Sequence, residues 1–385
     1  MTDGRAAGLG FVLIIHLSSD RLMTTIRAAV FTRPGEPLTI EEFACPRLQT
    51  GEALVRVDCC TVCGSDLRSL RGDRAVPVPT ILGHEILGTV IDVNDSPPLD
   101  LHGEPVVEGD RVTWGVAASC GTCDRCRRGI PQKCRFLFKY GHESTVKHPL
   151  GGGLAECCHL RAGTPVIRLN DELSDLEACP ASCATATVAA ALRIAGDVQD
   201  RSVLIFGAGM LGLTATAMAK MQGAVSVIVC DLDPKRLLQA LKFGATHTLP
   251  WIDDPQEMTS AVHSMAGDDG VDIVLEMSGA TSAIEVSPTL LTINGRLVLV
   301  GSVAPSGMVP FDPEQIVRRL LRIEGIHNYT PADLASAVDF LTAHHQEFPF
   351  ESLVERTFAL DEVNDAISFA QDTRPCRVAI VPNLK

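Results

Sequence analysis

The chain has 385 residues, of which 46% are hydrophobic and 21% are charged. This length predicts two or three domains, and the ordinary globular composition excludes disorder as a description of the whole chain. A formal charge of −14 would repel a phosphate backbone, so we expect no nucleic acid as a partner. The fourteen cysteines could form disulfides, bind metal or act as reactive thiols, and their spacing must decide.

The apolar runs of the sequence are shorter than the ~18 residues that a membrane-spanning helix needs. The longest early run, residues 11–17, has only Arg5 as a positive flank and no small-residue cleavage site after it. We therefore expect no signal peptide and no membrane contact, and we interpret residues 1–22 as a flexible N-terminal extension. A cytoplasmic location would keep the thiols reduced, which favours metal ligands over disulfides.

In chain order, the first third contains short apolar runs that are separated by glycine and proline. These runs predict β-strands at residues 26–31, 53–57, 88–93 and 110–113. An alanine-rich stretch at residues 178–195 then predicts a long helix.

From Ser202 onward strands alternate with helices, a pattern that is typical of a parallel sheet with crossover helices. The predicted elements are strands at 202–206, 225–230, 272–277, 296–300 and 377–381, and helices at 211–222, 234–243 and 331–343. We expect a β-rich domain that is interrupted by a nucleotide-binding domain.

The strand at 202–206 runs directly into the pattern G-x-G-x-x-G, formed by Gly207, Gly209 and Gly212. The first glycine permits a tight turn, the second lets the backbone approach a pyrophosphate, and the third lets the helix pack close to the sheet. The helix N-terminus at Met210 and Leu211 offers free N–H groups to phosphates. The segment therefore predicts a dinucleotide site.

Asp231 ends the next predicted strand, nineteen residues after Gly212. A carboxylate at that place can accept hydrogen bonds from the adenosine ribose and would repel a 2′-phosphate, which favours NAD over NADP. Lys235 and Arg236 keep the other coenzyme open, since nearby cations could accommodate that phosphate. A further alternative is that Asp231 only caps the helix that begins at Pro234.

Four cysteines lie in one short segment with the spacing C-x2-C-x2-C-x7-C. They are Cys120, Cys123, Cys126 and Cys134. Four thiolates suit a closed tetrahedral zinc site, which has no open position and is therefore structural. An iron–sulfur cluster is the alternative, but a gap of seven residues does not match the usual bacterial ferredoxin spacing.

A second candidate metal site is spread over three segments of the chain. Cys63 and His84 lie among glycine-punctuated strand ends, and Cys183 lies in the alanine-rich stretch. Two cysteines, one histidine and a water are a typical ligand set for a catalytic zinc, which keeps one open position. Cys179 competes with Cys183 for the third place on spacing alone.

Together, and in this order, these motifs resemble the zinc-dependent medium-chain alcohol dehydrogenases over residues 24–385. The resemblance implies an α/β fold, in which a GroES-like β-barrel catalytic domain carries an inserted Rossmann domain with a doubly wound parallel sheet. Residues 23–186 and 328–385 would form the catalytic domain, and residues 187–327 would form the NAD-binding domain. It also implies a homodimer or homotetramer, without favouring either.

The resemblance implies that Cys63, His84 and Cys183 bind a catalytic zinc. It favours Cys183 over Cys179, because in the family a threonine follows the ligand four residues later, and here that residue is Thr187.

The same resemblance implies roles for residues beside the ligands. Glu85 matches a carboxylate that can approach the metal, and Asp66 matches the partner that orients His84. Ser65 matches the hydroxyl that binds the substrate oxygen. Arg68 stands where many relatives carry a proton-relaying histidine, and arginine cannot easily relay a proton. Either the proton leaves through water or another histidine, or Arg68 binds the NAD pyrophosphate or an anionic substrate.

The resemblance to the family also implies which residues would line the cleft. Trp114 and Val116 would line the substrate pocket, with ordinary barrel core as the alternative. Val300 and Gly301 would receive the nicotinamide amide. The full set of expected cofactor-binding residues is Gly207, Gly209, Met210, Leu211, Gly212, Asp231, Arg236, Val300, Gly301 and Thr187.

The resemblance implies reversible, NAD-linked oxidation of a small-molecule alcohol, secondary or cyclic, to a ketone or aldehyde, with two zinc ions per chain. Residues 138–143, 184–187 and 327–329 resemble a bacterial branch that includes phosphonate-catabolism-associated and hydroxycamphor dehydrogenases. One alternative is an NADPH-dependent carbonyl reductase of the same fold, and another is a non-enzymatic NAD-binding protein. The intact ligand set counts against both alternatives.

Overall fold

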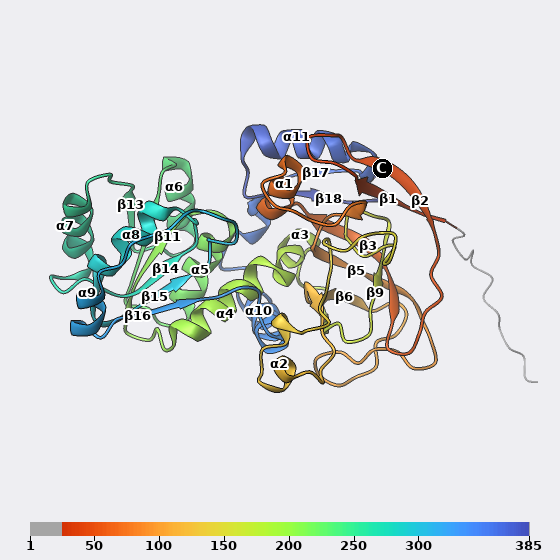
Figure 1. Ribbon diagram of the computed structural model, residues 1–385, viewed down its shortest axis with the longest axis horizontal. Coiled ribbons are helices and arrows are strands. Elements are labelled where there is room, and N and C mark those ends of the chain that lie inside the picture. The colour runs from red at the N-terminus through yellow and green to blue at the C-terminus, as the bar shows by residue number, and fades with distance from the viewer. Residues whose placement is uncertain (1–24, 385) are drawn as a thin grey trace, which may run out of the picture.

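The chain folds into two lobes, with helices α4 (Ala184–Ala195) and α10 (Pro331–His344) lying where they meet (Figure 1). The structure, a computed structural model, describes residues 25–384. The predicted extension at residues 1–22 therefore lies outside the described residues. One lobe is rich in antiparallel strands, and the other contains a parallel sheet with helices on its faces (Figure 1).

The strand-rich lobe is built from residues 25–178 together with residues 354–380. Its strands are β1 (Thr25–Phe31), β2 (Thr39–Ala44), β3 (Ala53–Thr61), β4 (Thr80–Ile81), β5 (Glu85–Val93), β6 (Arg111–Trp114), β7 (Ala117–Ala118), β8 (Phe138–Lys139), β9 (Cys157–Leu160), β10 (Val166–Arg168), β17 (Val354–Phe358) and β18 (Arg377–Ile380). Its helices are α1 (Gly64–Arg71), α2 (Asp124–Arg127), α3 (Asp175–Ala178) and α11 (Val363–Thr373).

The larger sheet of this lobe has the order β10-β6-β5-β3-β18-β17, and β9 also pairs with β3. Strand β18 pairs antiparallel with β3, with Ala379 opposite Thr61. Strands from the two ends of the described chain therefore share one sheet. The parallel-sheet lobe is inserted between them, as the alternation of patterns along the sequence predicts.

The second lobe contains a six-stranded sheet in which every neighbouring pair is parallel. Its strands are β11 (Ser202–Phe206), β12 (Ser226–Asp231), β13 (His247–Pro250), β14 (Val271–Glu276), β15 (Leu291–Leu299) and β16 (Arg322–Gly325). Its helices are α5 (Met210–Met221), α6 (Pro234–Lys242), α7 (Pro255–Ala266), α8 (Thr281–Leu290) and α9 (Pro313–Arg318). The order β13-β12-β11-β14-β15-β16 is that of a doubly wound dinucleotide-binding sheet, so this prediction is confirmed.

The predicted single helix at 178–195 is wrong, because the segment is broken at Cys183. Helix α3 passes into a 3₁₀ turn at Cys179–Ser182, and α4 begins only at Ala184, with a bend of 53° between the two parts. Cys183 has φ −134° and ψ −69°, which lie outside the helical region. Proline at position 180 opens the 3₁₀ turn. The break leaves the Cys183 side chain at a corner between the lobes.

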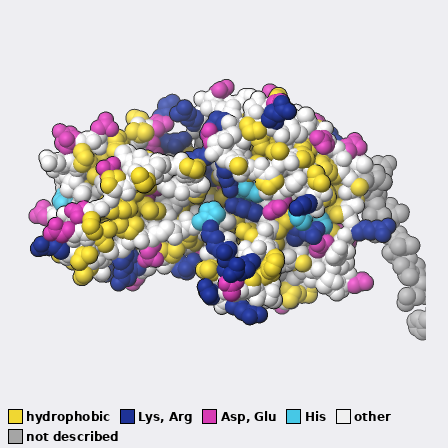
Figure 2. All heavy atoms as spheres, viewed as in Figure 1, with side chains coloured by type: hydrophobic (Ala, Val, Ile, Leu, Met, Phe, Trp, Pro, Cys, Tyr) yellow, Lys and Arg dark blue, Asp and Glu magenta, His cyan; other side chains and the backbone are white. Residues whose placement is uncertain are grey.

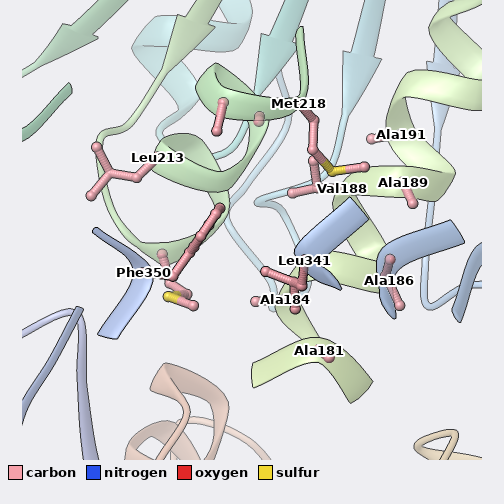
Figure 3. Close-up of a cluster of buried hydrophobic side chains, with 14 of the residues drawn as sticks. Ala181, Ala184, Ala186, Val188, Ala189, Ala191, Leu213, Met218, Leu341 and Phe350 are labelled. Atoms are coloured by element: carbon pink, nitrogen blue, oxygen red, sulfur yellow. The ribbon is translucent and has the colours of Figure 1, made fainter. Parts of the chain in front are cut away.

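Helix α4 packs in the largest hydrophobic cluster, against α5 and α10 (Figure 3). Its inner face consists mostly of alanine, which adds little side-chain bulk and lets neighbouring helices approach closely. Leu213, Met218 and Leu341 fill the space around it. In residues 25–384 no single helix is long and apolar enough to cross a membrane; only the bent pair Asp175–Ser182 and Ala184–Ala195, taken together, has that length and composition.

Candidate functional site

Three potential metal ligands converge between the lobes. The donor atoms of Cys63, His84 and Cys183 all lie within 4.8 Å of one another. Cys63 is the N-cap of α1, His84 immediately precedes β5, and Cys183 occupies the break before α4. The structure thus brings together residues 120 positions apart, and two thiols with one imidazole suit a zinc ion with a fourth, open position.

Asp66 holds two of these residues in place. Its Oδ2 accepts a hydrogen bond of 2.9 Å from the backbone N–H of Cys63, and its Oδ1 lies 3.2 Å from Nδ1 of His84. With Nδ1 engaged, Nε2 is the nitrogen that His84 offers to a metal. Ser65 Oγ lies 3.3 Å from that Nε2, so the hydroxyl borders the same position.

Glu85 lies behind the three ligands and is fully buried. Its two carboxylate oxygens accept hydrogen bonds of 2.6 and 2.7 Å from the guanidinium of Arg377, and Thr61 donates a further one of 2.6 Å. Arg377 Nη2 also lies 3.7 Å from the Sγ of Cys63. Sequence reasoning missed Arg377, although an arginine as the first residue of a predicted apolar strand was a signal for a buried charge partner.

The cysteines differ in their surroundings. A hydrogen bond from Cys183 and the positive charge of Arg377 hold the pKa of the Cys63 thiol well below its usual range, which suits a metal-binding thiolate. Cys179 instead points away, and its thiol donates to the backbone carbonyls of Cys59 and Glu85 at 3.4 and 3.2 Å. Of the two candidates for the third position, Cys183 is therefore the one beside Cys63 and His84.

The four cysteines of the predicted structural site also converge. They form a separate cluster around α2, consisting of Cys120, Cys123, Cys126 and Cys134. Three of the Sγ–Sγ separations are 3.4, 3.6 and 3.9 Å, and no described cysteine forms a disulfide. Four ligands placed tetrahedrally at 2.3 Å from one zinc ion would be about 3.8 Å apart. The donor set thus fits one metal ion better than an iron–sulfur cluster, in which the four thiolates are distributed over two or four irons.

The glycine fingerprint forms the turn between β11 and α5. Gly207 has φ +95°, and a Cβ on Gly212 would lie 1.7 Å from the carbonyl oxygen of Gly207, so both positions require glycine. Gly209 is the N-cap of α5 and leaves room for a ligand, because a Cβ there would meet only Arg236 Nη1 at 3.8 Å. Asp231, which ends β12, accepts a hydrogen bond of 2.6 Å from the N–H of Ala208.

A cavity of about 280 Å³ connects this turn to the three metal ligands. The lining residues that we expected are Cys63, Ser65, His84, Val116, Cys183, Thr187, Gly209, Met210, Leu211, Gly212, Val300 and Gly301. Arg68 also lines it. Figure 2 shows Lys, Arg and His side chains gathered where the lobes meet.

Trp114 is not part of the cavity wall, which corrects the expected pocket. Its side chain is buried in the barrel core, where its ring lies edge-on to Tyr140 with the centroids 6.1 Å apart. The large indole fills the barrel there, and β6 ends at Trp114, two residues before Val116, which lines the cavity.

Comparison with known proteins decides the family. Residues 49–171 match the alcohol dehydrogenase GroES-like domain, and residues 211–343 match the zinc-binding dehydrogenase domain. The chain is 30% identical to 5-exo-hydroxycamphor dehydrogenase from Pseudomonas putida over 326 residues, which cover 83% of this chain and 89% of that one. This protein belongs to the family of zinc-dependent medium-chain alcohol dehydrogenases.

Solved structures agree with the fold of this dehydrogenase. An alcohol dehydrogenase from Thermotoga maritima superposes with a TM-score of 0.88 at 29% identity, covering 93% of this chain and all of the other. A zinc-binding dehydrogenase from Sinorhizobium meliloti, bound to NADP, has a TM-score of 0.79 at 25% identity and covers 93% of this chain and 99% of its own. The predicted GroES-like domain with an inserted Rossmann sheet is confirmed.

Proposed function

We propose that this dehydrogenase reversibly oxidises a secondary or cyclic alcohol to a ketone, with NAD as the hydride acceptor. The observation that carries the proposal is one cavity with two ends. One end has three convergent metal ligands with an open fourth position, and the other has the N-terminus of α5 behind its glycine turn. The similarity to a hydroxycamphor dehydrogenase supports a cyclic secondary alcohol as substrate.

Cys63, His84 and Cys183 would hold the catalytic zinc, and the four-cysteine cluster would hold the structural one. Zinc at the first site would supply Lewis acidity, which lowers the pKa of the substrate hydroxyl towards neutrality. Ser65 Oγ, beside His84, is placed to accept the hydroxyl proton. Asp66 keeps the ring of His84 in its orientation throughout.

NAD would supply the carbon that receives the hydride, which carries both electrons away from the alcohol carbon. The backbone at Gly209 and Met210 would bind the pyrophosphate, and Asp231 the adenosine ribose. Val300 and Gly301 line the same cavity, where they would receive the nicotinamide amide. Holding both reactants between the lobes orients them and excludes water.

Glu85 has a supporting part in this scheme. Because its carboxylate is tied to Arg377 by two hydrogen bonds, it can approach the metal only if that pair opens. We propose that the Glu85–Arg377 pair instead sets the electrostatic environment of the Cys63 thiol.

The proposal is tested by following coenzyme reduction with primary, secondary and cyclic alcohols, while counting the zinc bound to the same preparation. We expect turnover with NAD and two zinc ions per chain. Two zinc ions without turnover on any alcohol would favour a non-enzymatic NAD-binding role. One zinc ion would contradict the catalytic assignment of Cys63, His84 and Cys183.

NADP is the second candidate coenzyme. The structural relative that is bound to NADP favours the alternative function, an NADPH-dependent carbonyl reductase. We favour NAD because Asp231 is fixed at the end of β12 by the N–H of Ala208, so its charge stays where a 2′-phosphate would lie. Arg236 is engaged with the carbonyl of Arg374.

Changing Asp231 to serine is expected to reduce the preference for NAD over NADP by about 10–100-fold, since one charge repulsion of about 1.4–3 kcal/mol is removed. The ratio of kcat/KM for the two coenzymes measures this. Asp233→Ser is the matched control, because that carboxylate caps α6 two residues later. Wild-type enzyme that prefers NADP would refute the role of Asp231.

Three further predictions accompany this function. The domain boundaries near residues 187 and 327 are supported by the positions of α4 and α10 at the junction of the lobes. A homodimer or homotetramer is supported by the free outer side of β16, which pairs only with β15 among the described strands. A cytoplasmic location is supported by two cysteine sites that need reduced thiols.

A further inference from the structure

The walls of the cavity carry an unusual set of charges for so acidic a protein. Its charged lining residues are Arg68, Arg74, Lys139 and Arg377, and no aspartate or glutamate of the described chain is among the lining residues. Arg377 is neutralised by Glu85. Three cationic side chains are therefore left in a cleft of a chain whose formal charge is −14.

Within residues 25–384, the side chains of Arg68, Arg74 and Lys139 form no ion pair and no hydrogen bond. The acids nearest in sequence to Arg74 and Lys139 are engaged elsewhere. Asp73 pairs with Arg71 at 2.9 Å, and Glu143 faces a different cavity and accepts a hydrogen bond from the backbone N–H of Lys139. The charges in the cavity are thus available to a ligand.

Lys139 lies towards the metal end of the cavity. The backbone N–H of His142 donates to the carbonyl of Lys139 at 3.1 Å, and the ring of His142 lies 5.3 Å from that of His84. Burial and the positive charge of Arg74 lower the pKa of Lys139 to about 8, so the two cations are close enough to repel each other. Such a pair gains most from an anion that both can contact.

The cofactor end has its own groups for the pyrophosphate. The N-terminus of α5 offers backbone N–H groups, and Arg236 lies within 3.8 Å of the space beside Gly209. Arg74 and Lys139 are therefore not needed to bind the dinucleotide. One more donor faces the same wall, because Nδ2 of Asn328 is buried without a partner.

We propose that Arg74 and Lys139 form an anion subsite in the substrate half of the cavity, so that the preferred alcohol carries an oxyanion group, either a carboxylate or a phosphonate. This inference rests on the proposed function and names its substrate class. The planar fork of Arg74 and the ammonium of Lys139 would each contact one oxygen of that group. Arg68 lines the same cavity and adds to the positive field.

The experiment compares secondary hydroxy acids with their methyl esters, and hydroxyalkylphosphonates with their neutral dimethyl esters, by kcat/KM at saturating NAD. In the wild-type enzyme the anionic alcohol is expected to exceed its ester by about 10–100-fold, since hydrogen bonds to charged groups contribute about 1.5–3 kcal/mol. Comparing kcat/KM for the hydroxy acids with kcat/KM for the hydroxyalkylphosphonates shows which oxyanion is preferred.

In Lys139→Gln and Arg74→Gln, kcat/KM for the anionic alcohol is expected to fall by a similar factor, mostly through KM. The values for the esters and the KM for NAD should stay within about twofold, and Lys139→Arg should keep much of the preference. Lys147→Gln and Arg71→Gln are the matched controls, because both side chains are exposed and neither lines the cavity.

Two failures are distinguishable. Esters that are oxidised as fast as the anions by the wild-type enzyme would overturn the subsite and leave the proposed function standing. If no alcohol is oxidised, the proposed function fails, and calorimetry with butyrate and butyramide tests the subsite separately. Equal binding of the acid and the amide, or binding of the acid that Lys139→Gln leaves unchanged, would then overturn it.

Discussion

Replacing Cys183 with serine is expected to lower kcat by at least about 1,000-fold and to reduce bound zinc from two ions per chain to one. Cys183 lies at the break before α4 and is one of three convergent ligands. Its hydroxyl replacement binds zinc poorly, and the Lewis acidity that is lost is worth several kcal/mol. Metal analysis and steady-state kinetics on one preparation measure both effects.

Cys179→Ser is the matched control for this variant. It lies four residues earlier and is equally part of the sequence motif, but its thiol donates to two backbone carbonyls. A serine hydroxyl can make the same bonds, so we expect two zinc ions and activity within about tenfold of wild type. Full turnover in Cys183→Ser with one zinc ion, or zinc loss in Cys179→Ser, would overturn the ligand assignment.

The second large effect concerns stability. Arg377→Met is expected to lower the free energy of unfolding by about 3–5 kcal/mol, because it leaves the charge of Glu85 buried without its partner. The loss would be measured by urea denaturation of the zinc-loaded protein. Adding Glu85→Gln to the same chain removes the unpaired charge, so the double variant should be more stable than Arg377→Met alone.

Arg318→Met tests whether burial is the cause. Arg318 forms an ion pair with Glu314 at 3.1 Å, but the two side chains are 77% and 69% exposed. An exposed pair contributes at most about 1 kcal/mol. Equal losses in Arg377→Met and Arg318→Met would contradict a special role for the buried pair.

The fold could be predicted from sequence wherever a pattern is local. The glycine fingerprint and the apolar strands around it identify the parallel sheet, since both depend on residues close together in the chain. Strands β13 and β16 gave no such signal: they lie at the two edges of the sheet, and their sequences HTLP and RIEG leave most side chains partly or fully exposed. Edge strands need no continuous apolar run.

The site was predictable where ligand chemistry restricts residue type, and less so elsewhere. Thiols at fixed spacing identify the four-cysteine site, whereas the choice of Cys183 over Cys179 at the other site depends on the family resemblance. The break at Cys183 was not predicted, because the alanine-rich composition favours a continuous helix, although Pro180 was a signal for an interruption. No spacing rule marks Arg74 or Lys139 as anion-binding residues, and only the folded structure shows that their charges share one cavity, whose walls contain no carboxylate of the described residues.

The position of β18 between β3 and β17 has a consequence for the order in which the protein is made. Glu85 is synthesised early, and the arginine that compensates its charge follows 292 residues later. All of the parallel-sheet lobe emerges in between and can form on its own contacts. The strand-rich lobe must wait for its last strand, so a nascent chain would carry an assembled nucleotide fold beside an incomplete barrel. The barrel closes when β18 pairs with β3, and these two strands are far apart in the sequence. We therefore expect this pairing to be the slow step in refolding.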